Sequence, residues 1–200
     1  MKKLNKKGFT LIELLAVIVI MGILMVVAIP AVTRTIENTR KDTYLNTAKQ
    51  YISQVKTLWS ADGLKCTNGG GSPEAVFSAS AFDGTYYVQI KGGSNFLLEE
   101  GGNSPWKVKA AGWLKIVRAS NVNTYSIYLE DTKGHVLAKE DGGQMDFVEE
   151  KSLSRSNNIT LTGTLAPQKT YDVTANTAYP SKGGAAPTAT DANTYICEEA

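Results

Sequence analysis

Residues 6–32 read KKGFTLIELLAVIVIMGILMVVAIPAV, and this stretch decides both the fold and the class of the protein. The nineteen residues from Leu14 to Val32 carry no charge, which is enough to cross the roughly 30 Å hydrocarbon core of a bilayer as a helix. Four lysines precede this run, and one carboxylate, Glu13, stands at its entrance. A carboxylate at mid-bilayer costs about 2.5 to 3.5 kcal/mol even on the mildest scale, so the position of Glu13 requires an explanation.

Two familiar kinds of N-terminus account for only part of the stretch. A secretory signal peptide would be removed near Ala31, but its apolar core usually has about 7 to 15 residues and no carboxylate at its front. A plain membrane anchor would hold the lysines in the cytoplasm and place residues 33–200 outside. The protein would then be a monomeric, membrane-anchored extracellular binding module.

A third interpretation uses every feature of the stretch. Residues 6–14, KKGFTLIEL, resemble the cleavage motif of the type IV pilin family. The resemblance implies that a prepilin peptidase cuts between Gly8 and Phe9 and methylates the new amine of Phe9. The apolar run follows the cut, so it would remain in the mature chain, whereas a signal peptide would be lost. The close resemblance covers about residues 6–60.

The resemblance also gives roles to three residues of the apolar helix. Glu13 of one subunit would form an assembly salt bridge with the Phe9 amine of a neighbour, which would fix the axial register of an incoming subunit. Each buried charge would offset the desolvation of the other, with a small net gain. Gly22 and Pro30 occupy the helix-weakening positions of this family. The helix between them would bend or partly unwind in a filament, and a harmless kink is the alternative.

The resemblance further implies a domain order and a set of partners. Residues 1–8 would be a cleaved leader, residues 9–33 the transmembrane and assembly half of a helix, and residues 34–200 an extracellular globular head that includes the second half of that helix. The precursor would span the membrane once with its N-terminus in the cytoplasm, and the mature chain would lie in a cell-surface pilus. Its partners would be copies of itself, other pilins, the prepilin peptidase and N-methyltransferase, and the inner-membrane assembly platform. A pseudopilin of a type II secretion or DNA-uptake machine would be processed in the same way.

The remaining sequence predicts an α+β fold. Residues 9–61 read as one helix, because after Pro30 the apolar positions recur mostly at spacings of three and four. Asp62–Gly63 is the predicted end, with Gly63 in the left-handed position. β-Branched and aromatic residues predict strands at 85–90, 113–119, 124–130 and 135–139. We expect an antiparallel sheet packed across the amphipathic half of the helix, as in the pilin head.

Other segments carry weaker signals. Tyr86, Tyr87, Trp106 and Trp113 are predicted to lie in the core rather than on a contact surface. We predict loops or short helices at 64–82 and 140–152, a further strand at 158–165, and a surface segment at 166–194.

Cys66 and Cys197 are the two cysteines, and their separation excludes a CxxC metal or redox motif. In a domain carried outside the membrane they suggest one disulfide, and two unpaired thiols are the alternative. Many pilins bracket a C-terminal surface loop with a disulfide. The spacing between the two cysteines is wider here, because Cys66 lies just past the predicted helix.

Charge argues against a nucleic-acid partner. The whole chain has a formal net charge of +2, and four of its lysines precede Gly8, so a chain cut after Gly8 carries −2. A mildly acidic protein has no general attraction for nucleic acid.

No motif predicts catalysis, a cofactor or a metal. His135 is the single histidine and is predicted to be an exposed turn residue, so we do not expect an enzyme. Glu140, Asp141 and Asp146 do not fit an EF-hand loop and are read as acidic surface turns, with a Ca²⁺ site as the alternative. Residues 158–160 match the glycosylation sequon by pattern alone.

Overall fold

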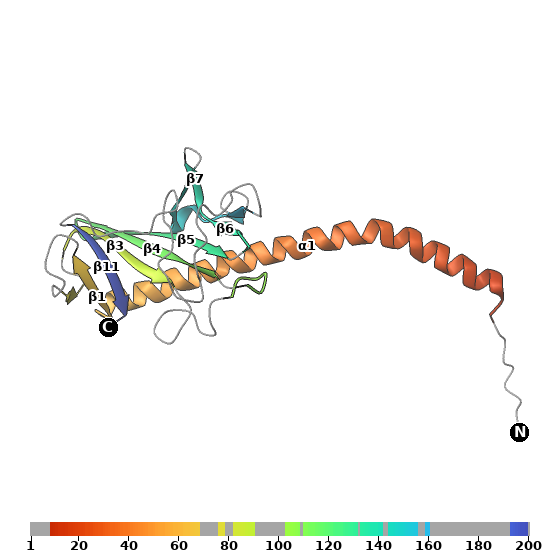
Figure 1. Cartoon of the computed structure of the whole chain (residues 1–200), viewed down its shortest axis with the longest axis horizontal. Helices are drawn as coiled ribbons and strands as arrows, with labels where there is room; N and C mark the ends of the chain where they lie inside the picture. The colour runs from red at the N-terminus through yellow and green to blue at the C-terminus, as the bar shows by residue number, and fades with distance from the viewer. Residues whose placement is uncertain are drawn as a thin grey trace, which may run out of the picture. The chain divides into compact units, whose positions relative to one another are not determined.

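The computed structural model describes residues 9–68, 76–78, 82–90, 103–108, 110–131, 133–141, 144–155, 159–160 and 193–199. It confirms the predicted α+β class, with one long helix and a mixed, mostly antiparallel sheet (Figure 1). The chain divides into two compact units, Met1–Thr39 and Arg40–Ala200. The second unit contains the end of the helix and all described strands, and we call it the sheet unit.

Helix α1 runs from Leu11 to Ser60 and ends in a Schellman motif. The Gly63 N–H donates to the Leu58 carbonyl at 2.8 Å, and the Asp62 N–H donates to the Trp59 carbonyl at 3.4 Å. Asp62, with φ of 53°, occupies the left-handed position, so the prediction of Gly63 for that position was wrong by one residue. Aspartate tolerates this conformation better than most residues with a side chain.

The strands are β1 (Leu64–Asn68), β2 (Val76–Ser78), β3 (Gly84–Ile90), β4 (Ala110–Ala119), β5 (Val122–Asp131), β6 (Val136–Leu137), β7 (Lys139–Asp141), β8 (Gln144–Asp146), β9 (Val148–Glu149), β10 (Ile159–Thr160) and β11 (Thr194–Glu199). A 3-10 helix, η2, covers Glu150–Ser152. Among the described residues the main sheet has the order β10-β6-β5-β4-β3-β11-β1-β2, and β9 pairs with β5. Strands β7 and β8 form a separate hairpin. All pairs in the main sheet are antiparallel except β3 with β11.

The central strands were predicted well and the peripheral ones were not. Strands β3, β4 and β5 confirm three of the predicted segments. The segment predicted at 135–139 contains only the two residues of β6 and the start of β7. The prediction of a loop or short helix for 64–82 was wrong where β1 and β2 form. That for 140–152 was wrong at the end of β7 and at β8 and β9, whereas η2 agrees with it. Of the strand predicted at 158–165, the structure describes β10, and residues 161–192 lie outside the described part of the chain.

Two hydrophobic clusters cover the two faces of the sheet. The larger one lies between the sheet and α1, and the helix contributes Tyr44, Leu45, Ala48, Tyr51, Ile52, Val55 and Trp59. The smaller one contains Ala111, Trp113, Tyr128, Val136, Ala138 and Phe147. Tyr86 and Trp106 belong to the larger cluster, Trp113 belongs to the smaller one, and Tyr87 packs against the smaller one. The core prediction is therefore confirmed for Tyr86, Trp106 and Trp113, whereas Tyr87 is only partly buried.

Candidate functional site

The first turn of α1 is closed by a reciprocal capping box between Thr10 and Glu13. The Thr10 N–H and the Thr10 hydroxyl donate to Oε2 of Glu13 at 2.8 and 2.7 Å, and the Glu13 N–H donates to Oγ1 of Thr10 at 3.4 Å. The Leu14 N–H donates to the Thr10 carbonyl at 3.2 Å. Thr10 was not singled out from the sequence, although Thr-x-x-Glu before an apolar run is the signal for such a cap.

Glu13 thus has a local function that needs no second subunit. Its carboxylate satisfies an N–H group at the helix end that would otherwise lack a partner. Phe9 precedes the helix and has 87% of its surface exposed. A salt bridge between Glu13 and the Phe9 amine of a neighbour requires a second chain, so that pairing stays a prediction.

The first half of α1 presents apolar side chains on all sides. Large hydrophobic residues from Leu11 to Val32 are exposed to between 51% and 83% of their surface. Contiguous apolar surface of this extent marks a membrane or protein interface. In the part of the chain that the structure describes, α1 is the one helix whose length and apolar composition would allow it to cross a membrane.

The helix is continuous through Gly22 and Pro30. A Cβ at Gly22 would meet no atom within 4 Å, so packing within this chain does not require a glycine there. After Pro30, the hydroxyls of Thr33 and Thr35 donate to the carbonyls of Ile29 and Ala31 at 2.9 and 3.0 Å. Such back-bonding often bends a helix. Bending or unwinding in an assembly stays a prediction.

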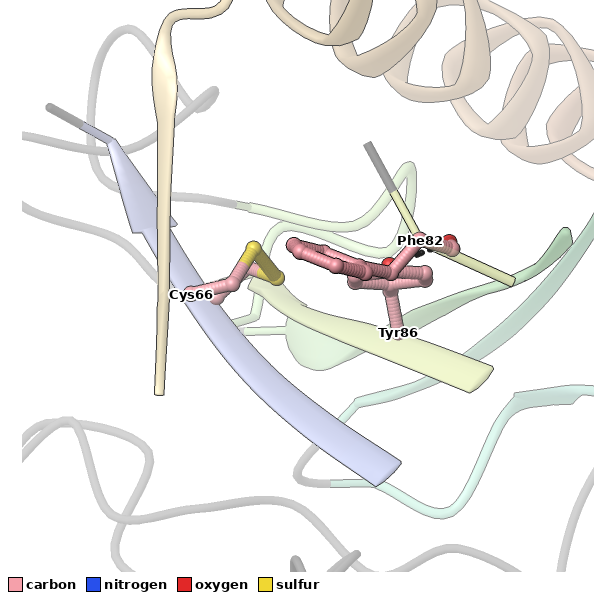
Figure 2. The surroundings of a disulfide bond; sticks show 4 residues. Cys66, Phe82 and Tyr86 are labelled. Carbon is pink, nitrogen blue, oxygen red and sulfur yellow. Dashed lines mark hydrogen bonds between the residues drawn. A yellow bond between two sulfur atoms is a disulfide. The ribbon is translucent and has the colours of Figure 1, made fainter. Parts of the chain in front are cut away.

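The structure brings the two cysteines together in a disulfide (Figure 2). Cys66 on β1 is directly opposite Cys197 on β11, and both side chains are buried. Tyr86 of β3 lies beside the bond and donates its hydroxyl to the Phe82 carbonyl at 2.6 Å (Figure 2). The disulfide therefore joins the strand that follows α1 to a strand near the other end of the chain.

His135 is buried, so the prediction of an exposed turn residue was wrong. Its Nδ1 lies 2.7 Å from Oδ2 of Asp131, and its ring stacks on Trp106 with 3.9 Å between the centroids. The Ser104 hydroxyl donates to the same Oδ2 at 2.6 Å. In a catalytic triad the serine donates to the imidazole, whereas here it donates to the carboxylate. Asp131 therefore links Ser104 to His135, an order of contacts that differs from that of a catalytic triad.

Of the three acidic side chains considered for a Ca²⁺ site, the structure describes only that of Asp146. Among the described residues, no group of three His, Cys, Asp or Glu side chains is arranged to hold a metal ion. Oδ1 of Asp146 accepts the Phe147 N–H at 2.8 Å. The side chains of Glu140 and Asp141, and the sequon at residues 158–160, lie outside what the structure describes.

One comparison with known families gives a match. Residues 3–29 match the family model described as the prokaryotic N-terminal methylation motif. No curated protein and no solved structure matches the chain. The motif points to a structural subunit rather than to an enzyme family, and the apolar helix and the disulfide fit a pilin-like protein. The chain therefore carries, at residues 3–29, the N-terminal methylation motif that is the signature of type IV prepilins.

Proposed function

We propose that the chain is a structural subunit of a type IV pilus. The prepilin peptidase cuts between Gly8 and Phe9, methylates the amine of Phe9, and leaves the apolar helix as the new N-terminal segment. Residues 9–33 then anchor the subunit in the membrane and later pack in the filament, and residues 34–200 form the extracellular head. The observation that carries the proposal is the methylation motif followed directly by an exposed apolar helix with one carboxylate in its first turn.

In this proposal the carboxylate of Glu13 has two partners in succession. In the single chain it accepts hydrogen bonds from Thr10. In the filament it meets the Phe9 amine of a neighbour, a cation that is itself costly to bury alone. Glu13 then exchanges the hydrogen bonds of the helix cap for a charge pair. That pair fixes the axial register of each subunit that the assembly platform adds.

Two substitutions of Glu13 separate the cap from the charge. Glu13→Gln keeps a side-chain oxygen for the cap, since Gln also serves in a capping box, but it removes the charge. Glu13→Ala removes both functions. We expect both variants to be cleaved normally and to form few or no filaments, measured by the N-terminal mass of the subunit and by the yield of sheared filaments. Thr10→Ala, which keeps the carboxylate, is the control and should still assemble.

The outcomes distinguish the proposal from its competitors. Normal filaments from both Glu13 variants would remove the proposed salt bridge. Met1 still present in membrane-associated wild-type protein would contradict a pilin and favour a membrane-anchored binding module. A processed chain that is absent from sheared surface filaments would indicate a pseudopilin.

A further inference from the structure

Strand β11 joins two parts of the sheet that have no other described pairing. It lies between β3 and β1, parallel to the first and antiparallel to the second (Figure 1). Within the described residues, β1 pairs only with β11 and β2, and β2 pairs only with β1. The β1–β2 pair is therefore connected to the rest of the sheet through β11.

Side chains of β11 contribute to both faces of the sheet. On the helix side, the Tyr195 ring stacks on Tyr86 with 4.6 Å between centroids. Tyr86 in turn meets Trp59 of α1 edge-on at 4.8 Å. On the opposite face, Ile196 packs against the smaller hydrophobic cluster. Removing β11 would thus expose aromatic surface without disturbing the long ladder between β4 and β5.

The entry of β11 into the sheet needs a glycine on β3. A Cβ added at Gly84 would lie 2.6 Å from the Asn193 carbonyl oxygen and 2.7 Å from Cε2 of Tyr195. The Thr85 N–H donates to the same carbonyl at 2.8 Å. Any side chain at Gly84 would push β11 away from β3 at its first residues.

We propose that β1, β2 and β11 form one local opening unit and that the Cys66–Cys197 disulfide is its latch. With the bond formed, β11 cannot separate from β1, so the three strands leave β3 only transiently and as one piece. With the bond reduced, β11 withdraws from β3 together with β1 and β2. Strands β3, β4 and β5 remain folded on α1, because the β3–β4 and β4–β5 ladders pair over 7 and 10 residues without using β11. This inference does not depend on the proposed function.

The latch closes by thiol–disulfide exchange. The two cysteine thiols lose two protons and two electrons and form the S–S bond, while the disulfide of a small-molecule or protein oxidant is reduced to two thiols. Because both sulfur-bearing residues are buried, with 0% and 1% of their surface exposed, opening of this unit must precede reduction.

Hydrogen exchange with the double variant Cys66→Ala/Cys197→Ala tests the unit. Local openings have their own free energies below that of global unfolding, so we expect amides of 64–68 and 194–199 to exchange at least about tenfold faster than in the oxidised protein. Amides of 110–119 and 122–131 should change less than about threefold. Gly84→Ala, which keeps the disulfide, should raise exchange in the same two segments. Equal loss of protection throughout the sheet, or no change at 64–68 and 194–199, would overturn the proposal.

Reduction kinetics test it on the unmodified chain, in case the double variant does not fold. The oxidised protein is mixed with increasing concentrations of dithiothreitol, and free thiols are trapped with iodoacetamide. The rate should reach a plateau equal to the opening rate of the unit, at least about tenfold faster than global unfolding. A plateau equal to the global unfolding rate would overturn the latch.

Discussion

Asp131 is a buried carboxylate that ties together two segments of the sheet unit 27 residues apart in the chain. It accepts four hydrogen bonds, from the Ser104 hydroxyl, from His135 Nδ1, and from the backbone N–H groups of Lys133 and His135. Replacing it would remove the acceptor of three buried donors, the Ser104 hydroxyl and the N–H and Nδ1 of His135, and of the partly buried Lys133 N–H. We expect Asp131→Ala to lower the free energy of unfolding by about 3 to 5 kcal/mol.

Asp42→Ala is the matched control for that experiment. The Asp42 carboxylate also has a charged partner, Arg155 at 2.9 Å, but about half of each side chain is exposed. Exposed ion pairs contribute about 0 to 1 kcal/mol, so this variant should unfold close to the wild-type urea concentration. Equal effects of the two substitutions, measured by urea denaturation, would contradict the role given to Asp131.

The raised pKa of the buried Tyr86 phenol predicts how the free energy of unfolding depends on alkaline pH. Burial, followed by the neighbouring Tyr195, raises the pKa of Tyr86 from 10.0 to about 12. Between these values the unfolded chain has lost the phenolic proton and the folded chain keeps it, so unfolding releases a proton and stability falls as pH rises. The contribution of Tyr86 is complete below pH 10 and is lost as pH rises through 12.

Urea denaturation between pH 10 and 12 measures this dependence. Tyr86→Phe should flatten it without abolishing it, because burial also raises the pKa values of Tyr44, Tyr51 and Tyr128. At neutral pH the variant should lose about 1 kcal/mol, since the Phe82 carbonyl loses its hydroxyl donor. An unchanged slope would show that Tyr86 does not hold its proton in the folded chain.

His135 shows the limit of prediction from sequence at this scale. The run Asp-Thr-Lys-Gly-His reads as a turn, and Gly134 does have a positive φ of 79°. Trp106, which stacks on the imidazole, and Ser104, which donates to the same Asp131 carboxylate, come from a segment about 30 residues upstream. No local pattern connects that segment to His135. Tyr86 and Trp113 were predictable because they alternate within strongly patterned strands.

At the scale of elements, α1 begins where Thr10 caps it. Thr10→Ala should weaken the first turn by about 1 kcal/mol, because the Glu13 N–H loses its hydroxyl acceptor and Oε2 of Glu13 loses its hydroxyl donor, while the backbone N–H of residue 10 can still donate to Glu13. Thr10→Ser keeps the hydroxyl and is the control. Hydrogen exchange at Leu11 to Glu13 in a detergent-bound chain measures the effect, and equal exchange in the two variants would show that the box does not stabilise the turn.

The elements that could be predicted are those whose own residues specify them. Helix α1 and strands β3, β4 and β5 are long and strongly periodic, so the pattern alone identifies them. Strand β1 is only Leu-Lys-Cys-Thr-Asn, and it becomes a strand because β11 supplies its partner 131 residues away. The parallel pairing of β11 with β3 depends on tertiary contacts, and no turn signal in the sequence between them predicts it.

At the scale of the whole molecule, the two halves of α1 meet different surroundings. Its buried residues all lie between Tyr44 and Trp59, inside the sheet unit. Among the described residues, none packs over Leu11 to Val32, so we expect the free energy of covering them to come from lipid or from other chains. The fold of the sheet unit and the assembly proposed for the subunit therefore depend on separate stretches of one helix, and we expect substitutions to affect one without the other.

Processing should also change the charge of the whole molecule. The complete chain has an isoelectric point of about 8.4, and removal of residues 1–8 takes away four lysines and leaves a formal charge of −2. A methylated amine still carries a proton at neutral pH, so methylation itself does not change the net charge. We expect the mature protein to focus below pH 7, with an intact mass that lacks residues 1–8 and includes one methyl group. The same chain produced without the peptidase is the control and should focus near 8.4. A basic isoelectric point in protein recovered from cells that contain the peptidase would show that the leader stays attached, and the salt bridge proposed for Glu13 would then have no amine to pair with.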